Sequence, residues 1–268
     1  MKRGLCIVGF LVLAAQLTLW GYDTSPSNLQ IVPEAIYAAA TGGGTWATDV
    51  QITNFSSTPA DITVYFFYNG GSTGPILLHQ ALPTYNCYEY VYVLAAIDSA
   101  DPGPLTYYGH VGAVWFLTQS PSVKIHVEAM TVNGNYGKTA PALNRVEINT
   151  AANGRPMVLQ HLVQNPVYRT SVGVHNTSPT ETYEVQFVVV SAINTTIGLP
   201  FTKTLAPGAF ESFNPFAAAG VPTQICANCW LYILVTAGGS GPNGVMCYGS
   251  IANNYTNDTY ALIARMYY

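Results

Sequence analysis

An internal repeat limits what this chain can fold into more than any other feature of its sequence. The run from Trp46 to Asn54, WATDVQITN, matches the run from Tyr168 to Asn176, YRTSVGVHN, at an offset of 122 residues. Each run has an aromatic residue, a threonine, an alternating pair of apolar residues and a final asparagine. A turn rich in serine, threonine and proline follows each, and then a second alternating strand. Because self-similarity at a fixed spacing indicates one structural unit built more than once, we expect two copies of one unit.

The alternation of apolar and polar residues predicts β-strands in both copies. β-Branched and aromatic residues recur at every second position, bounded by Gly, Pro, Asn and Ser. Seven or so short strands in roughly 110 residues favour a sandwich of two sheets, with one face of each strand inward and the other toward water. No helix longer than one turn is expected. The expected strands are 30–40, 46–54, 61–68, 75–81, 86–94, 110–118 and 123–132, and then 157–163, 168–176, 183–191, 199–205, 209–214, 229–236, 245–253 and 260–267.

The fold class that follows is all-β, with two tandem β-sandwich domains of the same fold related by internal duplication. Residues 144–156 break the alternation and contain Asn-Gly, so they are the expected linker. The first domain is then expected at residues 22–143 and the second at 157–268. The apolar stretch from Asn28 to Ala40 lies outside the best-aligned repeat. It is expected either to complete its own sheet or to add as a strand to a neighbouring molecule.

Residues 1–21 are expected to be a secretory signal peptide. Lys2 and Arg3 precede an apolar run from Leu5 to Leu19, and the small residue Gly21 precedes a polar stretch, which is the order of such a signal. The run is shorter than the roughly 20 residues that a membrane-spanning helix needs. Cleavage is therefore favoured over a permanent anchor, and the mature protein is expected to be secreted or to lie at the cell surface, without a stable membrane span.

The chain carries very little charge. Charged residues are 8% of the sequence, against roughly 25% in ordinary soluble domains. The net charge of −4 and the lack of a basic run argue against nucleic-acid binding, and the many aromatic residues exclude disorder. Because so few charges give little repulsion between copies, we expect self-association or attached glycans to cover much of the surface.

Segments in both halves resemble a known repeat. Residues 31–36 (IVPEAI), 42–54 (GGGTWATDVQITN) and 248–259 (YGSIANNYTNDT), together with Tyr168 to Asn176, are similar to a tandem repeat of exported bacterial proteins. The resemblance spans most of the mature chain and depends on strand and turn motifs. It implies a pair of immunoglobulin-like β-sandwiches at or outside the cell surface, in a family without an established activity.

Four cysteines remain once the signal is removed: Cys87, Cys226, Cys229 and Cys247. An even number in an exported protein indicates disulfides, and four cysteines allow three connectivities. Cys226 and Cys229 also have the spacing of a zinc knuckle or of a thioredoxin-type redox pair. A zinc site would need two further ligands, and a redox pair would normally head a helix, so structural disulfides are favoured. A bond to Cys87 would lock the two units together.

No motif in the sequence indicates catalysis. The acidic residues share no common pattern, and Asp98 with Asp101 is interpreted as a turn. Nucleophile-elbow, phosphate-loop and dinucleotide motifs do not occur in the sequence. We therefore expect no catalytic residue, no metal site and no cofactor. The histidines are scattered along the expected strands without metal-ligand spacing: His79, His110, His126, His161 and His175.

Two asparagines occupy matching places in the repeat. Asn54 and Asn176 each end a strand just before a turn, where the side chain can bond the local backbone. Both also begin an N-x-S sequon, and Asn194, Asn254 and Asn257 begin three more. A role in turns is favoured, and glycosylation is the alternative.

These observations favour a secreted, non-catalytic structural or adhesive subunit of an extracellular or cell-surface assembly, such as a filament or layer. The partners are then further copies or other cell-surface proteins. The alternative is a carbohydrate- or surface-binding module that uses tyrosines such as Tyr88, Tyr90 and Tyr92, which are expected to share one strand face. A lower alternative is an outer-membrane β-barrel, because the tail from Tyr260 to Tyr268 alternates and ends in an aromatic residue.

Overall fold

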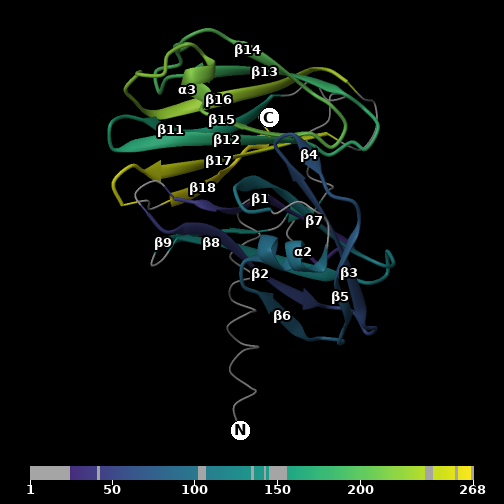
Figure 1. The fold of residues 1–268 in the computed structure, drawn as a ribbon. Helices are drawn as coiled ribbons and strands as arrows, with labels where there is room; N and C mark the ends of the chain where they lie inside the picture. Colours follow the sequence, from purple (N-terminus) through teal and green to yellow (C-terminus); the bar gives the residue numbers. More distant parts are fainter. Residues whose placement is uncertain are drawn as a thin grey trace.

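The computed structural model describes residues 25–40, 43–101, 107–133, 136–141, 143–144, 156–238, 244–256 and 259–266. The expected signal peptide, residues 145–155 of the expected linker and the sequon residue Asn257 lie outside these ranges. The described chain is all-β, with antiparallel sheets stacked as β-sandwiches (Figure 1). This confirms the fold class predicted from the alternation.

The first unit is a sandwich of two sheets with the strand orders β5-β3-β7-β1 and β6-β2-β8-β9. β1 pairs with β7 and then with β2, so it belongs to both sheets. The apolar N-terminal stretch therefore completes its own sheets, and its addition to a neighbour is not observed. The elements are β1 (Leu29–Ala39), β2 (Thr45–Asn54), β3 (Ala60–Tyr68), β4 (Gly71–Ser72), β5 (Ile76–Leu82), β6 (Cys87–Tyr90), α2 (Val93–Ala100), β7 (His110–Thr118), β8 (Ile125–Asn133), β9 (Tyr136–Pro141) and β10 (Leu143–Asn144).

The second unit repeats the strand order within each sheet, but β11 does not pair with β12 as β1 pairs with β2. Its sheets have the orders β14-β13-β16-β11 and β15-β12-β17-β18, and β19 pairs with β11 as β10 pairs with β1. A short helix follows β6 in the first unit and β15 in the second. The shared strand order agrees with the sequence repeat, and an origin by duplication stays a prediction. The elements are β11 (Met157–Gln164), β12 (Tyr168–Asn176), β13 (Tyr183–Val190), β14 (Phe201–Leu205), β15 (Phe210–Phe213), α3 (Pro215–Ala218), β16 (Cys226–Ala237), β17 (Val245–Asn253), β18 (Thr259–Ile263) and β19 (Arg265–Met266).

Asn54 and Asn176 show how closely the two units correspond. Each is fully buried, and its side-chain nitrogen donates to three backbone carbonyls while its oxygen accepts the N–H two residues later. Asn54 donates to Thr58, Leu82 and Pro83 and accepts from Ser56, and Asn176 donates to Glu181, Leu205 and Ala206 and accepts from Ser178. Each asparagine thus ties the turn after its strand to the end of β5 or β14, and satisfies carbonyls that would otherwise be buried without a donor.

One helix, α2, departs from the expectation that no helix is longer than one turn. The strand expected over residues 86–94 ends at Tyr90, and α2 follows it. Tyr92 has a φ of 58°, which stops the extended conformation, and its N–H donates to Asp49 Oδ1 at 2.8 Å. α2 then buries Val93, Leu94 and Ile97 in the core of the first sandwich. The expectation that no helix exceeds one turn was wrong for α2, because a short apolar run was interpreted as the end of a strand.

The two sandwiches are joined through a third apolar core. Leu29, Ile31 and Ala113, on the outer face of the β5-β3-β7-β1 sheet, pack against Phe210 and Tyr248 on the outer face of the β15-β12-β17-β18 sheet. Figure 1 shows the four sheets stacked in layers, with these two in the middle. The expectation that outer faces meet water is therefore wrong for the middle sheets. The second of them is buried on both faces, as the unbroken burial along most of β17 shows.

Gly173 on β12 lets the ring of Tyr248 lie close against the strand in this junction. A Cβ at Gly173 would come within 2.3 Å of the Tyr248 ring, which is far below van der Waals contact. The missing side chain is therefore a packing requirement of the junction.

His175 lies fully buried in the same junction. Its Nε2 accepts a hydrogen bond from Trp115 Nε1 of the first unit at 2.9 Å, and its Nδ1 lies 3.2 Å from the carbonyl oxygen of Ala209. A carbonyl only accepts, so Nδ1 carries the proton. Burial lowers the pKa of His175 to about 4, and the bond to Ala209 only partly opposes this effect. His175 is therefore a neutral ring whose two polar ends are both satisfied.

Acid should weaken the fold through this histidine. The pKa of His175 is 6.5 when the chain is unfolded and about 4 when it is folded, so between these values only the unfolded chain takes up the proton. The free energy of unfolding then falls by about 3 kcal/mol as the pH decreases through this window, and it does not change above it on account of this group. Urea unfolding at several pH values measures the effect. His175→Gln is the control, and an equal pH slope in both proteins would contradict the assignment.

Candidate functional site

Three aromatic rings fill the open edge of the first sandwich between β5 and β6. The ring centroid of His79 lies 4.5 Å from that of Tyr88 and 6.1 Å from that of Tyr90, and the two tyrosine rings are 4.7 Å apart. We call His79, Tyr88 and Tyr90 the edge cluster. Tyr90 is partly buried against the core of the sandwich, whereas Tyr88 is 45% exposed. The cluster thus presents ring surface to solvent from a fixed base.

Hydrogen bonds set the orientation of the rings. The Tyr90 hydroxyl donates to the carbonyl of Leu78 at 2.9 Å, so its single proton is used there. His79 Nδ1, 2.7 Å from the same hydroxyl, must therefore be the donor, which leaves Nε2 as an acceptor. Burial lowers the pKa of His79 and raises that of Tyr90 to about 12, with a smaller contribution from Tyr88. Both groups are neutral near pH 7, so the pair does not form an activated nucleophile.

The same position in the second unit has different chemistry. Lys203 Nζ lies 2.6 Å from Glu211 Oε2 and 4.9 Å from the centre of the Phe213 ring. The strand registers match these residues to the edge cluster, since His79, Tyr88 and Tyr90 lie opposite Ile62, Ile52 and Val50, and Lys203, Glu211 and Phe213 lie opposite Val185, Val174 and Val172. An ion pair closes the edge of the second unit, whereas exposed rings close the edge of the first.

Tyr92 does not share the strand face of Tyr88 and Tyr90, contrary to the expectation. It follows the end of β6, and its ring stacks on Tyr37 with a centroid distance of 5.9 Å. Tyr108 meets the other side of this group edge-on, 5.0 Å from Tyr37. The first unit therefore carries a second group of tyrosines beside the start of α2.

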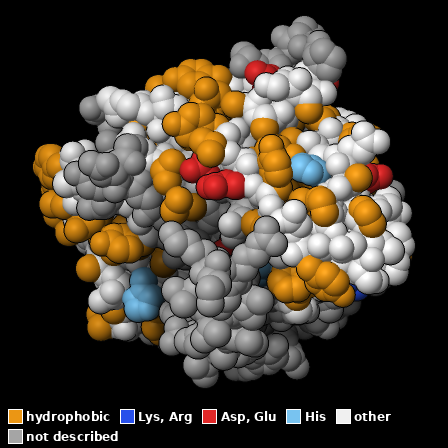
Figure 2. Space-filling model, turned by 90° about the horizontal axis from the view of Figure 1, so that it is seen from below, with side chains coloured by type: hydrophobic (Ala, Val, Ile, Leu, Met, Phe, Trp, Pro, Cys, Tyr) orange, Lys and Arg blue, Asp and Glu red, His pale blue; other side chains and the backbone are white. Residues whose placement is uncertain are grey.

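Among the described residues, the first unit carries more exposed aromatic rings than the second. Tyr85 is 72% exposed, and Tyr92 and Tyr108 resemble Tyr88 in exposure. Figure 2 views the molecule from the side of the first unit and shows hydrophobic side chains in several groups, with histidines beside some of them. Tyrosine offers a large, rigid ring and a polar hydroxyl, so such groups suit contact with amphipathic partners, including sugars and proteins.

The outer face of the β6-β2-β8 sheet is polar and acidic. Asp49, Glu89 and Glu128 point outward from adjacent strands of this sheet, and Figure 2 shows acidic side chains gathered near the middle of this side. His126 Nε2 lies 3.5 Å from Glu128 Oε1, and its hydrogen bond lowers the pKa of that carboxyl. Burial raises the pKa of the Cys87 thiol at the edge of the same sheet, so the group is a thiol rather than a thiolate at neutral pH.

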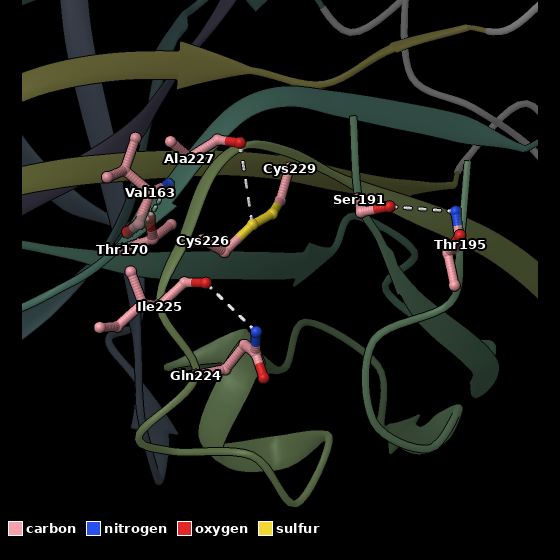
Figure 3. The surroundings of a disulfide bond; sticks show 9 residues. All are labelled: Val163, Thr170, Ser191, Thr195, Gln224, Ile225, Cys226, Ala227 and Cys229. Atoms are coloured by element: carbon pink, nitrogen blue, oxygen red, sulfur yellow. Dashed lines mark hydrogen bonds between the residues drawn. A yellow bond between two sulfur atoms is a disulfide. The ribbon is translucent and has the colours of Figure 1, made fainter. Parts of the chain in front are cut away.

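The four described cysteines form one disulfide, between Cys226 and Cys229 at the start of β16 (Figure 3). Asn228 between them has a φ of 56°, a conformation that asparagine tolerates well. Cys87 is exposed and unbonded, and Cys247 is buried and unbonded, with a pKa raised by burial. The disulfide therefore closes a local loop, and no cysteine bond joins the two units.

The sequon asparagines lie in different environments. Asn54 and Asn176 have buried amide nitrogens that already donate to three carbonyls each, so neither has room for a sugar in the folded chain. Asn254 is half-buried, donates to the carbonyl of Pro166 and accepts from Arg169. Asn194 lies exposed in the loop after β13, where its φ is 61°. Of the four described sequon asparagines, Asn194 alone is exposed.

The described residues contain no group of three His, Cys, Asp or Glu side chains that could hold a metal ion. His79, His126 and His175 lie in three separate places: the edge cluster, the acidic face and the junction. Asp98, which was expected in a turn, lies in α2. In the part of the chain that the structure describes, no helix has the length and apolar character to cross a membrane.

Comparison with known proteins gives only distant likenesses. No family model and no curated protein matches the sequence. A solved structure of infectious bursal disease virus, Gx strain, is 10% identical over 90% of this chain and 72% of that chain, with a TM-score of 0.21. The C-terminal domain of the Streptococcus agalactiae AgI/II polypeptide BspA is 11% identical over 88% of this chain and all of that chain, with a TM-score of 0.20. At these scores the likenesses carry no argument about this chain.

The cysteine arrangement predicts a definite thiol count for the chain without residues 1–21, purified under oxidising conditions. One thiol, Cys87, should react with a thiol reagent at about pH 8 in the native protein, where burial slows the thiol but does not hide it. Two thiols should react after denaturation, when Cys247 is exposed, and four after reduction. Cys87→Ser should lower each count by one. A denatured protein without reactive thiols would mean that Cys87 and Cys247 are bonded instead.

Proposed function

We propose that the protein is a secreted, non-catalytic structural or adhesive subunit of an extracellular or cell-surface assembly. The observation that carries the proposal is the group of exposed tyrosine rings on the first unit, Tyr85, Tyr88, Tyr92 and Tyr108. This unit is joined to the second through a shared apolar core. The rings of the edge cluster are held by each other and by hydrogen bonds, so a partner would order few side chains on binding. A surface prepared in this way suits recognition rather than chemistry.

The junction supports the same proposal because it should make the molecule rigid. Because the sandwiches share an apolar core, the body is expected to resist bending at the point where tandem domains usually move. A rigid body of this kind fixes the distance between its two ends. That property is useful in a filament, a layer or an adhesin, where subunits carry load or set spacing.

Export is supported by the disulfide and by the N-terminal sequence. A disulfide persists in oxidising compartments outside the cytosol, and the pair Cys226–Cys229 is bonded. The apolar run that precedes residue 21 has the order of a secretory signal. Secretion accounts for both features, and the N-terminal residue of the protein recovered from the medium or the cell surface is its direct test.

The tandem-repeat hypothesis gains support from the matched strand order and from the two asparagine networks. Duplication of an immunoglobulin-like sandwich accounts for both at once, whereas two unrelated sandwiches would have to acquire the same turn chemistry independently. We therefore place the chain with tandem β-sandwich repeat proteins exported by bacteria as part of this proposal.

Sheet edges are poor candidates for the contacts of such an assembly. β14 carries Lys203 in the middle of a five-residue strand, and β5 is irregular where it pairs with β3. A lysine and an irregular pairing are two common means by which proteins block addition of a further strand. Contacts through side-chain surfaces fit this molecule better than contacts through backbone pairing.

Carbohydrate binding is the second candidate, and the edge cluster favours it. Tyr88 offers a ring face to the apolar side of a sugar, and His79 Nε2 is an acceptor for a sugar hydroxyl beside it. Among the described sequons, Asn194 is the one whose exposure best suits an attached glycan.

The double variant Tyr85→Ser/Tyr88→Ser should reduce binding at least tenfold, because both rings are exposed and support little of the core. The assay measures retention of the chain without residues 1–21 on immobilised polysaccharides and on immobilised extracellular proteins. Tyr255→Ser/Tyr260→Ser is the matched control, since these tyrosines are 74% and 59% exposed on the second unit, and it should bind like the wild type. Retention on polysaccharide alone favours the second candidate and retention on protein favours the first. Unchanged binding by the Tyr85/Tyr88 variant would contradict both.

A further inference from the structure

Two exposed tyrosines of the first unit occupy strained backbone positions. Tyr85 has a φ of 53° and Tyr92 a φ of 58°, in the left-handed region that bulky residues rarely adopt. They lie before and after β6, the edge strand that carries Tyr88 and Tyr90 of the edge cluster. Tyr85 is 72% exposed and Tyr92 is 44% exposed, so burial of the rings in the core does not account for the strain.

The second unit shows which residue suits the first of these positions. Tyr85 corresponds to Gly208, because in both turns the N–H of the following residue donates to the carbonyl three residues before it. Gly208 has a φ of 67°, which glycine adopts without strain. A Cβ at Gly208 would also come within 3.0 Å of the Phe67 ring. The first unit has a tyrosine at the same turn position, with its ring in solvent.

The entry to the short helix differs between the units in the same way. Asn214 precedes α3, and its side-chain oxygen accepts the N–H groups of Phe216 and Ala217, as a good helix cap does. Tyr92 precedes α2 without a side-chain cap, and the bond from its own N–H to Asp49 Oδ1 holds its left-handed backbone. At both ends of β6 the first unit therefore has an exposed ring where the second has a residue that suits the backbone.

Strain at exposed positions points to a ligand rather than to the fold. Strained backbone concentrates at ligand sites, where the surrounding structure enforces it, and an exposed ring contributes little to the core. Tyr88, 45% exposed, lies between the two strained tyrosines. Seven residues of largely extended chain separate Tyr85 from Tyr92, which is roughly 20 Å. Three exposed rings thus follow one edge of the first unit, and Figure 1 shows β6 on the side of that unit away from the second.

The chemistry beside the rings limits the ligand. His79 Nε2 is an acceptor, and it has no partner among the described residues. From Ile76 to Asp101 the sequence contains no Lys or Arg, whereas it contains three carboxylates. An anionic ligand is therefore disfavoured at this edge. A ligand that brings hydroxyl donors and no negative charge is favoured.

We infer that this edge binds an extended, uncharged glycan whose sugar rings carry their hydroxyls equatorially. Such sugars have flat C–H faces that stack on tyrosine rings, and their hydroxyls donate to acceptors such as His79 Nε2. A linear chain of repeated sugars matches rings spaced along one edge, whereas a single sugar reaches only one ring. Linked contacts along one chain raise the affinity together. The inference rests on the adhesive function proposed above and names the ligand of that same site.

Calorimetric titration of the chain without residues 1–21 tests the inference. Cellohexaose or chitohexaose should bind at least tenfold more tightly than cellobiose, because only the longer chains reach more than one ring. The two hexasaccharides distinguish a glucose chain from an N-acetylglucosamine chain. Maltohexaose, which joins glucose units into a coiled chain, is the matched control ligand and should bind at least tenfold more weakly than the better hexasaccharide.

Two variants test the strained tyrosines with that hexasaccharide. Tyr85→Gly and Tyr92→Asn should each weaken binding at least threefold, while the urea midpoint of unfolding stays equal or rises, because glycine and asparagine tolerate the left-handed backbone. A merely structural role would instead lower the midpoint and leave binding unchanged. Tyr255→Ser removes an equally exposed ring from the second unit, and it should bind like the wild type.

The outcomes separate this inference from the proposed function. Equal affinity for cellobiose and both hexasaccharides would overturn the inference, and so would wild-type binding by both Tyr85→Gly and Tyr92→Asn. Retention on immobilised extracellular proteins through Tyr85 and Tyr88, without binding of any glycan, would overturn the inference and leave the adhesive function standing. Retention on neither glycans nor proteins would overturn both.

Discussion

The contact between the outer faces of the two middle sheets holds the rest of this structure in place. It removes Leu29, Ile31 and Tyr248 from water, and it accounts for a chain with so many hydrophobic residues and so few charges. A sheet buried on both faces cannot carry polar residues at alternate positions. β17 accordingly lacks this alternation and is buried along most of its length. The hydrogen bond from Trp115 to His175 satisfies the polar groups that the contact encloses. Because the buried His175 ring must stay neutral, the free energy of unfolding decreases at acidic pH.

The two units use one fold for two purposes. The asparagine networks, the strand order and the inserted helix are common to both, so these features serve the fold itself. The differences lie at the surface: the edge cluster of the first unit stands where Lys203 and Glu211 pair in the second. Surface substitution on a constant core explains why recognition is proposed for the first unit.

Periodicity in the sequence predicts most of the strands and the correspondence of the halves, because each strand has one buried face. It does not predict the stacking of the units, although a signal for it exists: the apolar run from Val111 to Leu117 lacks alternation, which indicates burial on both faces. The partners in the edge cluster depend on an irregular register between β3 and β5, which spacing alone does not reveal. The choice of Cys229 as the partner of Cys226 likewise depends on the local bend at the start of β16, and the sequence leaves all three connectivities open.

The central claim is that the two sandwiches form one body through a shared apolar core. Differential scanning calorimetry of the chain without residues 1–21, at low concentration and neutral pH, tests it most directly. The account predicts one transition whose calorimetric and van't Hoff enthalpies agree, because neither unit keeps its middle sheet covered after the other unfolds. Two resolved transitions, each with the enthalpy of half the chain, would contradict it.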